Sequence, residues 1–458
     1  MHETYAKALS IALEQTSPAL ARRRQPALDQ LFAGSEDETT RLDLARFCWD
    51  MYRGDQLRHV PRLPGESALE YSRRPHKQFL NVTRVLVDVL SQLYRQPISR
   101  RLDAGAATER IQRAYTRNPM GQIMLTVDRL TRLQGACALR VGYQDGEIRL
   151  WPYPAHRLIV VPDPTMPLRP LAVVAFAAGD EGSTPLAHVW TAESVTTVHQ
   201  GRVAGEVKHT LGRVPFVFFH DALPVDGFWS EGRGRSITHA NAIFNAKLSE
   251  LAYTVAMQGF GVMEIVNPDP AKDIAIGPGR AIAFTVGQGQ PYGVSFKAPN
   301  APIAELIADL EFQLRTLLKT QRIPESVLSV NVGGNVSGAS IVAAGSPVIE
   351  DRVERMQLFR AGEADLLDAI AAVLREHEGV QAQAPTLALD FPEPRLEQTV
   401  ADRIALDDWR LDRGMTTPWE LMLRDDPDAY DNLEAAKQAW LARRAEMRTL
   451  NIQTERDA

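Results

Sequence analysis

The stretch Val214-Pro-Phe-Val-Phe-Phe219 opens the region, residues 214 to 372, that decides the fold of this chain. Its β-branched and aromatic residues predict a strand. A loop follows, and residues 236 to 258 then carry apolar side chains three or four apart, which predicts an amphipathic helix with Ser236 as its N-cap. The apolar stripe is Ile237, Ala240, Phe244, Leu248, Leu251 and Val255. At 1.5 Å per residue, this helix is a rod of about 35 Å.

A proline-rich insert, residues 262 to 302, separates this rod from a second one. Strand-like runs lie between the prolines and glycines at 262 to 266, 281 to 286 and 292 to 296. The second amphipathic helix is expected at 303 to 319, and Pro324 closes it. Its apolar stripe is Ile303, Leu306, Ile307, Leu310, Leu314, Leu317 and Leu318. Two such stripes can pack on each other inside one subunit or against neighbouring subunits, and the pattern leaves both open.

A glycine-rich loop, Asn331-Val-Gly-Gly-Asn-Val-Ser-Gly338, precedes a third and longer helix, expected from about 339 to 376. The loop has the glycine spacing of a P-loop, but Ala339 stands where the phosphate-binding lysine is required. Nucleotide binding is therefore not expected, and Ser337 is interpreted as a cap. Pro347 lies inside the long helix and should kink it.

Working outward, the N-terminal region is mostly helical in pattern, with helices expected at 42 to 53, 79 to 94 and 123 to 133. A β-rich lobe follows from about 136 to 219 and begins with a hairpin around Gln144-Asp-Gly146. Its further strands are expected at 158 to 161, 171 to 176, 188 to 191 and 195 to 199. Two helical runs are expected after Pro394, the last at 433 to 450. The fold class is α+β.

Composition restricts the classes of function. The 458 residues are 45% hydrophobic and 24% charged, typical of a globular protein, and 51 basic against 57 acidic residues give a net charge of -6. A protein that coats DNA phosphates should be basic, whereas one that DNA merely passes through need not be. No window approaches the ~18 apolar residues of a membrane span, and the N-terminus lacks the order of a signal peptide. A reducing cytoplasm is the expected compartment.

No pattern predicts a catalytic, cofactor or metal site. Cys48 and Cys137 have no metal spacing and are interpreted as buried reduced thiols. Glu206-Val-Lys-His209 has Glu-x-x-His spacing but lies in the β-rich lobe, so we interpret it as a solvated pair. Gly232-Arg-Gly-Arg-Ser236 could hold a phosphate, although a plain turn with solvated arginines is favoured. The expectation is a protein that is not an enzyme and has no cofactor.

The order of these parts resembles the portal proteins of tailed double-stranded DNA bacteriophages, the head-tail connectors. Each motif is weak alone, and their order is the specific feature. The motifs are Leu211 to Phe219 before the first helix, Ile323-Pro-Glu-Ser followed by Asn335-Val-Ser-Gly-Ala-Ser340, Gly135-Ala-Cys-Ala-Leu-Arg-Val with Trp151-Pro-Tyr-Pro, and Arg403 to Leu421 with Gly414-Met-Thr-Thr. Together they cover nearly the whole chain.

The resemblance implies a ring subunit with a helical stem, a small α/β clip, a β-rich wing and a helical crown. The implied parts are a wing at 1–235, stem helix one at 236–261, a clip at 262–302, stem helix two at 303–323, a tunnel loop at 324–338, a kinked wing helix with the C-terminal wing at 339–430, and a crown helix at 431–458.

The implied function is a portal ring, usually of about twelve copies, at one capsid vertex of the virion. Double-stranded DNA is packaged and ejected through it, and it is assembled in the host cytoplasm. Implied partners are the terminase large subunit, which is the separate ATPase, the major capsid and scaffold proteins, and a head-tail adaptor. No membrane is involved. Two alternatives stay open: another ring-forming virion connector or adaptor, and a nucleic-acid-processing enzyme.

The resemblance also assigns candidate residues to three parts. The tunnel loop facing DNA is Val330, Asn331, Val332, Gly333, Gly334, Asn335 and Val336, a segment without charge. The stem residues are Phe244, Leu248, Leu251, Leu310, Leu314, Arg315 and Lys319. The clip residues expected to dock partners are Lys272, Asp273, Arg280, Gln288 and Gln290.

Overall fold

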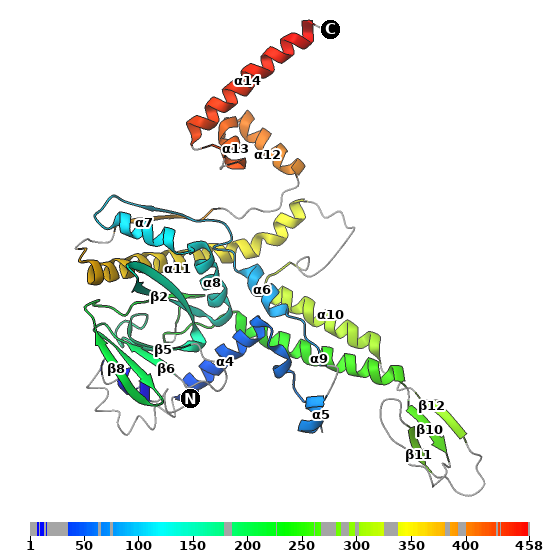
Figure 1. Ribbon diagram of the computed structural model, residues 1–458. Helices are drawn as coiled ribbons and strands as arrows, with labels where there is room; N and C mark the ends of the chain where they lie inside the picture. Colours follow the sequence, from blue (N-terminus) through cyan, green and yellow to red (C-terminus); the bar gives the residue numbers. More distant parts are fainter. Residues whose placement is uncertain are drawn as a thin grey trace. The chain divides into compact units, whose positions relative to one another are not determined.

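The computed structural model shows an α+β protein (Figure 1). It describes residues 7, 8, 10–12, 15, 35–62, 66–73, 77–177, 186–225, 227–260, 262–266, 281–284, 293–297, 302–324, 338–380, 385–392, 400–426, 429–430 and 432–456. The chain divides into two compact units. One comprises residues 1–329 and 347–392, and the other comprises residues 330–346 and 393–458.

The helices of the first unit are α4 (Ser35–Arg53), α5 (Ala68–Arg73), α6 (Val82–Leu90), α7 (Thr108–Arg117), α8 (Met120–Gln134), α9 (Gly234–Phe260), α10 (Ile303–Thr320) and most of α11 (Gly338–Glu378). Its strands are β1 (Ser99–Leu102), β2 (Ala136–Gln144), β3 (Glu147–Pro154), β4 (Leu158–Pro162), β5 (Pro170–Phe176), β6 (Leu186–Trp190), β7 (Ser194–His199), β8 (Arg202–Lys208), β9 (Phe216–His220), β10 (Val262–Val266), β11 (Ala281–Phe284), β12 (Gly293–Lys297) and β13 (Leu387–Asp390).

The β-rich lobe consists of two sheets packed face to face. One has the strand order β3-β2-β9 and the other the order β4-β5-β6-β7-β8, with antiparallel neighbours throughout. The predicted hairpin joins β2 to β3, and Gln144 pairs with Glu147. Asp145 and Gly146 both have positive φ, at 53° and 76°. This is the backbone that an Asp-Gly hairpin turn requires, so the sequence signal is confirmed.

Alternating side chains of these strands fill three apolar layers. From β2, Cys137 and Leu139 point to the helices, whereas Ala138 points to the five-stranded sheet. From β5, Val173 faces the first sheet and Val174 faces the other way. That outer layer is closed by Ala8, Ile11 and Ala12 of the N-terminal helical residues together with Leu42 of α4. The lobe is therefore covered by helices on both outer faces.

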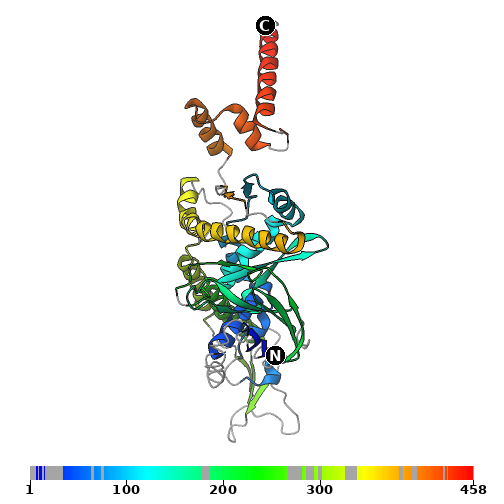
Figure 2. The ribbon, with the colours of Figure 1, turned by 90° about the vertical axis from the view of Figure 1, so that its left-hand side faces the viewer.

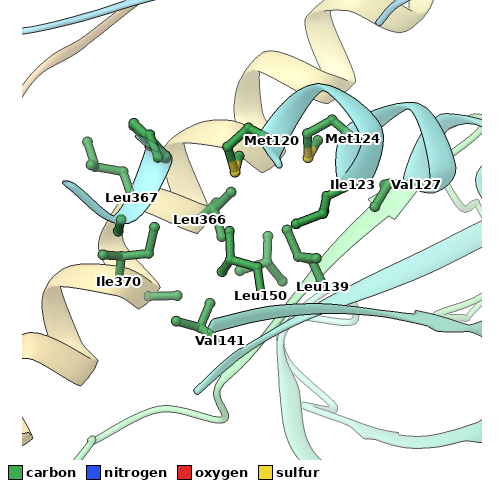
Figure 3. Packing of buried hydrophobic residues seen from close by; sticks show 14 of the residues in the cluster. Met120, Ile123, Met124, Val127, Leu139, Val141, Leu150, Leu366, Leu367 and Ile370 are labelled. Carbon is green, nitrogen blue, oxygen red and sulfur yellow. The ribbon is translucent and has the colours of Figure 1, made fainter. Parts of the chain in front are cut away.

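The largest core lies between the three-stranded sheet and helices α7, α8 and α11, and Figure 3 shows its centre. Met124 and Val127 of α8 meet Leu139 of β2, and Ile370 of α11 lies over Val141. Both ribbon views place α11 along this face of the sheet (Figures 1 and 2). The helix runs without interruption past Pro347, where the two compact units divide.

Helix α11 crosses β9 at a glycine. A Cβ atom on Gly362 would lie 2.5 Å from the Cε1 atom of Phe219, whose side chain is 1% exposed. Phe359, one turn earlier on α11, packs on the same ring with centroids 5.2 Å apart. The close approach of helix and strand therefore depends on the missing side chain at position 362.

The insert and the two rods are found where the sequence predicted them. Helices α9 and α10 lie side by side, and between them the chain forms a three-stranded sheet of order β11-β10-β12 (Figure 1). Strand β10 is parallel to β11 and antiparallel to β12. The residues between these strands lie outside the described part of the chain.

The second unit contains α12 (Val400–Asp412), α13 (Pro418–Asp425) and α14 (Leu433–Arg456). Thr417 and Glu420 form a capping box at the start of α13, which fixes where that helix begins. Trp419 of α13 meets Trp440 of α14 with ring centroids 5.5 Å apart. Arg424 of α13 donates to Asp407 of α12 at 2.8 and 2.6 Å.

Several sequence expectations were wrong. Helix α9 begins at Gly234, so Ser236 is not its N-cap, and its hydroxyl donates to the Arg233 carbonyl at 2.9 Å. The helix expected at 79 to 94 is limited to α6, because Asn81 caps its start by accepting from the Arg84 N–H. Among the described residues after Pro394, the structure has three helices where two were expected. The pattern also missed α7, the exposed strand β8, and the ribbon that pairs β1 with β13.

Replacing Gly362 with alanine tests the crossing of α11 and β9. The new methyl group meets the buried Phe219 ring, so we expect a loss of about 1–3 kcal/mol in unfolding free energy, measured by urea titration. The matched control is Gly121→Ala in α8, where a Cβ atom has no neighbour within 4 Å. Helix propensity should make the control neutral or more stable by up to about 1 kcal/mol. Equal stability of the two variants would contradict the close contact.

Candidate functional site

The base of the paired helices α9 and α10 is where the predicted stem residues meet the rest of the first unit. There α6 contributes Val82, Leu86 and Leu90, α9 contributes Ile237, and α10 contributes Leu318, with Ile323 just beyond it. Leu314 and Leu317 pack on this cluster. At the base, the apolar stripes of α9 and α10 therefore face each other and α6. This agrees with the interpretation in which the two stripes pack on each other inside one subunit.

The individual stem candidates differ in burial. Phe244 and Leu310 are buried, at 9% and 7% exposed. Leu248, Leu251 and Leu314 are half-buried, whereas Arg315 and Lys319 are exposed. Arg315 pairs with Glu311 at 3.0 Å on the outer face of α10. The apolar members are thus packing residues, and the two cations belong to the surface of this single chain.

The paired helices also keep large apolar side chains in solvent. Those on α9 are Ile243, Tyr253 and Val255, and those on α10 are Leu306, Ile307 and Phe312. Phe312 is 67% exposed and Ile243 is 57% exposed, and both line a groove of about 300 Å³ between the helices. The floor of the groove includes Phe244 and Leu317. Large apolar side chains left exposed beside a buried stripe are typical of a helix pair that needs further packing partners.

A polar face of α9 fastens residues 78 to 83, the segment that leads into the first turn of α6. The Asn241 side chain accepts from the Thr83 N–H at 3.0 Å and donates to the Leu80 carbonyl at 2.9 Å. One turn later, Asn245 accepts from the Leu80 N–H at 3.0 Å, and Ser249 accepts from the Gln78 N–H at 3.0 Å. All three α9 side chains are at most 1% exposed. These side chains provide hydrogen-bond partners for backbone N–H and carbonyl groups that are not paired within a strand or a helix.

Three glycines let the chain enter α9 in contact with the end of α8. Gly135 ends α8 with φ 85°, and its Cβ atom would lie 2.0 Å from the Ser230 carbonyl oxygen. A Cβ atom on Gly232 would lie 2.3 Å from the Gly135 nitrogen, and one on Gly234 would lie 2.0 Å from the Leu133 carbonyl oxygen. Any side chain at these positions would separate the two segments.

A buried ionic cluster lies beside this crossing. It consists of Asp128 and Arg132 of α8, Asp221 after β9, Arg233 before α9, and Asp351 and Arg355 of α11, so three carboxylates meet three guanidinium groups. Arg132 pairs with Asp221 at 3.1 Å and with Asp351, and Arg355 pairs with Asp128 at 2.6 Å and with Asp221 at 3.0 Å. Five of the six side chains are at most 5% exposed.

The sixth member corrects an interpretation made from the sequence. Arg233 was expected to be solvated in a plain turn, but it pairs with the buried Asp351 at 2.5 Å and is 32% exposed. Its neighbour Arg235 is exposed and lies 3.4 Å from Glu231. The glycines around Arg233 serve the close crossing with α8, so this motif is a structural joint.

Two further sequence interpretations can be compared with the structure. Cys48 and Cys137 are both free thiols and buried, as expected. Glu206 is exposed on β8, but His209 is not solvated. Its ring packs near Trp190 with centroids 6.3 Å apart, and burial lowers its pKa. Within the described ranges, no three His, Cys, Asp or Glu side chains group so that they could hold a metal ion.

The remaining candidates lie outside the described residues. They are the tunnel-loop residues Val330 to Val336 and the clip residues Lys272, Asp273, Arg280, Gln288 and Gln290. Sequence reasoning missed the ionic cluster altogether. Its members are scattered between positions 128 and 355. The one signal that could have been noticed is that Asp128 and Arg132 follow the apolar Met124 of α8 at four-residue helical spacing.

Comparisons with known proteins add little to this picture. No family model matches the chain, and no curated protein does. Solved structures that are similar to it include the neck of a native GTA particle computed with C12 symmetry, at 14% identity and a TM-score of 0.42, covering 74% of this chain and 87% of that chain. The neck of an empty GTA particle computed with C6 symmetry gives 13% identity, a TM-score of 0.41, and coverage of 74% and 88%. Both TM-scores are below 0.5, so these likenesses assign no function to this chain. In the described part of the chain, no helix is long and apolar enough to cross a membrane.

Replacing Asn241 with alanine tests the polar face of α9. The change leaves the buried Thr83 N–H without its acceptor, so we expect a loss of about 1–3 kcal/mol in unfolding free energy by urea titration. The control is Lys247→Ala on the same helix, whose partner Asp309 is 2.6 Å away and 45% exposed. Such exposed pairs contribute at most about 1 kcal/mol. Asn241→Ala should therefore be the more damaging change, and the reverse order would count against the fastening role.

Two histidines near this base predict a pH dependence of stability. Burial, with the positive charge of Arg157 next, lowers the pKa of His156 to about 3, and burial lowers the pKa of His220 to about 4. Both are neutral when folded but are protonated near pH 6.5 in the unfolded chain, so stability falls as the pH drops from 7 towards 4.

We expect the urea midpoint to fall between pH 7 and pH 5. In His220→Phe, the loss of unfolding free energy between these two pH values should be smaller by about 2 kcal/mol. An unchanged difference between the two pH values in that variant would show that His220 is not held neutral.

Proposed function

We propose that this chain is a portal-type subunit, a non-enzymatic ring component through which double-stranded DNA enters and leaves a tailed-phage-like particle. One observation carries the proposal. Strand β9, helix α9, a three-stranded insert, helix α10 and the 41-residue helix α11 follow one another in the order that the resemblance implies. The proposed parts keep the boundaries given in the sequence analysis, with α9 and α10 as the stem and β10 to β12 as part of the clip.

The exposed side chains of the paired helices support assembly. Phe312, Ile243 and the other exposed apolar residues of α9 and α10 would be shielded by neighbouring copies. A head-to-tail interface repeated around an axis closes into a ring without leaving any apolar edge exposed. The proposed number of about twelve copies comes from the resemblance alone.

The charge of the chain supports a channel that does not hold DNA tightly. Its net charge of -6 would repel the phosphate backbone on average, which suits a duplex that must slide. On the surface of α10, Glu305 and Glu311 lie towards the insert, whereas Arg315 and Lys319 lie towards the base. Weak and mixed contacts of this kind would favour passage over binding.

The proposed partners follow from the proposed parts. The insert would dock the terminase large subunit during packaging and a head-tail adaptor afterwards, and the wing would meet the major capsid and scaffold proteins. The segment 324–338 would be the tunnel loop beside the DNA. ATP hydrolysis would belong to the terminase, since Ala339 stands at the position of the P-loop lysine.

Replacing Phe312 with aspartate tests assembly through the stem. The side chain is 67% exposed, so the single chain should fold normally, but a charge placed in an apolar interface should prevent ring formation. Size-exclusion chromatography with light scattering gives the mass of the assembly. We expect the wild type to be a large oligomer and the variant to be mostly monomer.

Two further variants make this test specific. Val207→Asp introduces the same charge on β8 at a residue that is 65% exposed, and should assemble like the wild type. Leu310→Glu affects a residue that is 7% exposed, and should lower the stability of the chain itself. A Phe312→Asp variant with the mass of the wild-type oligomer would show that the stem is not an interface.

A further inference from the structure

The buried ionic cluster joins the segments on which the stem and the long helix depend. Asp351 accepts from Arg233 at 2.5 Å and also pairs with Arg132. Arg233 lies directly before α9, and Asp351 lies one turn after Pro347 on α11. A single carboxylate therefore connects the first turn of the stem with the part of α11 where the two compact units divide.

Both halves of α11 within the first unit pack through apolar side chains, but only one of them also carries buried charges. From Leu366 to Leu374 the contacts are apolar and attract without strong direction. From Asp351 to Glu363 buried charges add to the apolar packing of Phe359. Besides Asp351 and Arg355, Glu363 is fully buried and accepts from Arg100 Nε at 3.0 Å and from the Tyr94 hydroxyl at 2.9 Å.

Charges of alternating sign fix the axial position of a helix. If α11 moved by one turn, about 5.4 Å, Arg355 would take the place of Asp351 and face Arg132 and Arg233. In the opposite direction, Pro347 would take that place, so Arg233 would lose its acceptor in the cluster and Arg132 would keep only Asp221. Buried unpaired charges are strongly unfavourable, and either slip would also bring a leucine, Leu358 or Leu366, to the place where Gly362 contacts the Phe219 ring, so both slips are penalised.

We propose that this cluster is a register lock, which fixes the axial position of α11 and couples it to the first turn of α9. A displacement of α11 then shifts the start of α9 through the ion pair of Asp351 with Arg233, and a displacement of α9 shifts α11 through the same pair. The coupling is a property of the single chain and goes beyond the proposed portal function.

Hydrogen–deuterium exchange on the purified full-length chain tests this coupling. Asp351→Asn keeps the shape of the side chain but removes its charge. We expect exchange to rise by roughly tenfold in residues 348–356 and also in residues 234–240. Arg233→Lys, at a side chain that is 32% exposed, should give a smaller rise in the same two segments even if Asp351→Asn folds poorly.

The control is Asp365→Asn on the exposed face of α11, where Asp365 is 45% exposed and pairs with Arg213 at 2.8 Å. It should leave both segments unchanged. A rise confined to residues 348–356 in the Asp351 variant would overturn the coupling. So would a uniform rise over all peptides that follows a lower urea midpoint, because that pattern reports general loss of stability. The proposed ring could fail while this result stands, because assembly is not needed for it.

Discussion

The first unit depends on one buried ionic cluster. In it, the carboxylates of Asp128, Asp221 and Asp351 pair with the guanidinium groups of Arg132, Arg233 and Arg355. It joins α8, the end of β9, the entry to α9 and the first buried turn of α11, segments that together span positions 128 to 355 of the chain. Removing one partner from such a cluster typically costs about 3–5 kcal/mol, because the others stay buried and unpaired. The three glycines at positions 135, 232 and 234 bring the backbones close enough for these charges to meet.

The paired helices α9 and α10 extend from this base, and they make fewer contacts with other elements further from it. Near the cluster, α9 is held by its polar face on residues 78 to 83 and by the apolar packing of α6. Further along, Leu306, Ile307 and Phe312 remain exposed. A firmly anchored base and an apolar outer surface are what a subunit needs if it keeps its own shape and buries the rest of its surface on its neighbours. The proposed ring therefore rests on this contrast between a well-packed base and exposed apolar side chains further along the same helices.

Local signals made much of this fold predictable. The Asp145-Gly146 turn, the Gly135 helix end and the periodic stripes of α9 and α10 each depend on a few neighbouring residues, and each was located within a few positions. Strand β8 was missed because all seven of its residues are exposed and show no burial pattern. The ionic cluster and the Asn241 contacts could not be foreseen, because they depend on which distant segments meet. Arg233 was misinterpreted for the same reason, since its partner lies 118 positions later in the chain.

Electron microscopy of the purified full-length chain tests the central claim most directly. Ring assembly by a stem of α9 and α10 predicts particles with rotational symmetry and an axial opening wide enough for duplex DNA, with the paired helices surrounding that opening. A population of compact monomers at micromolar concentration, or a closed oligomer without an axial opening, would contradict the account.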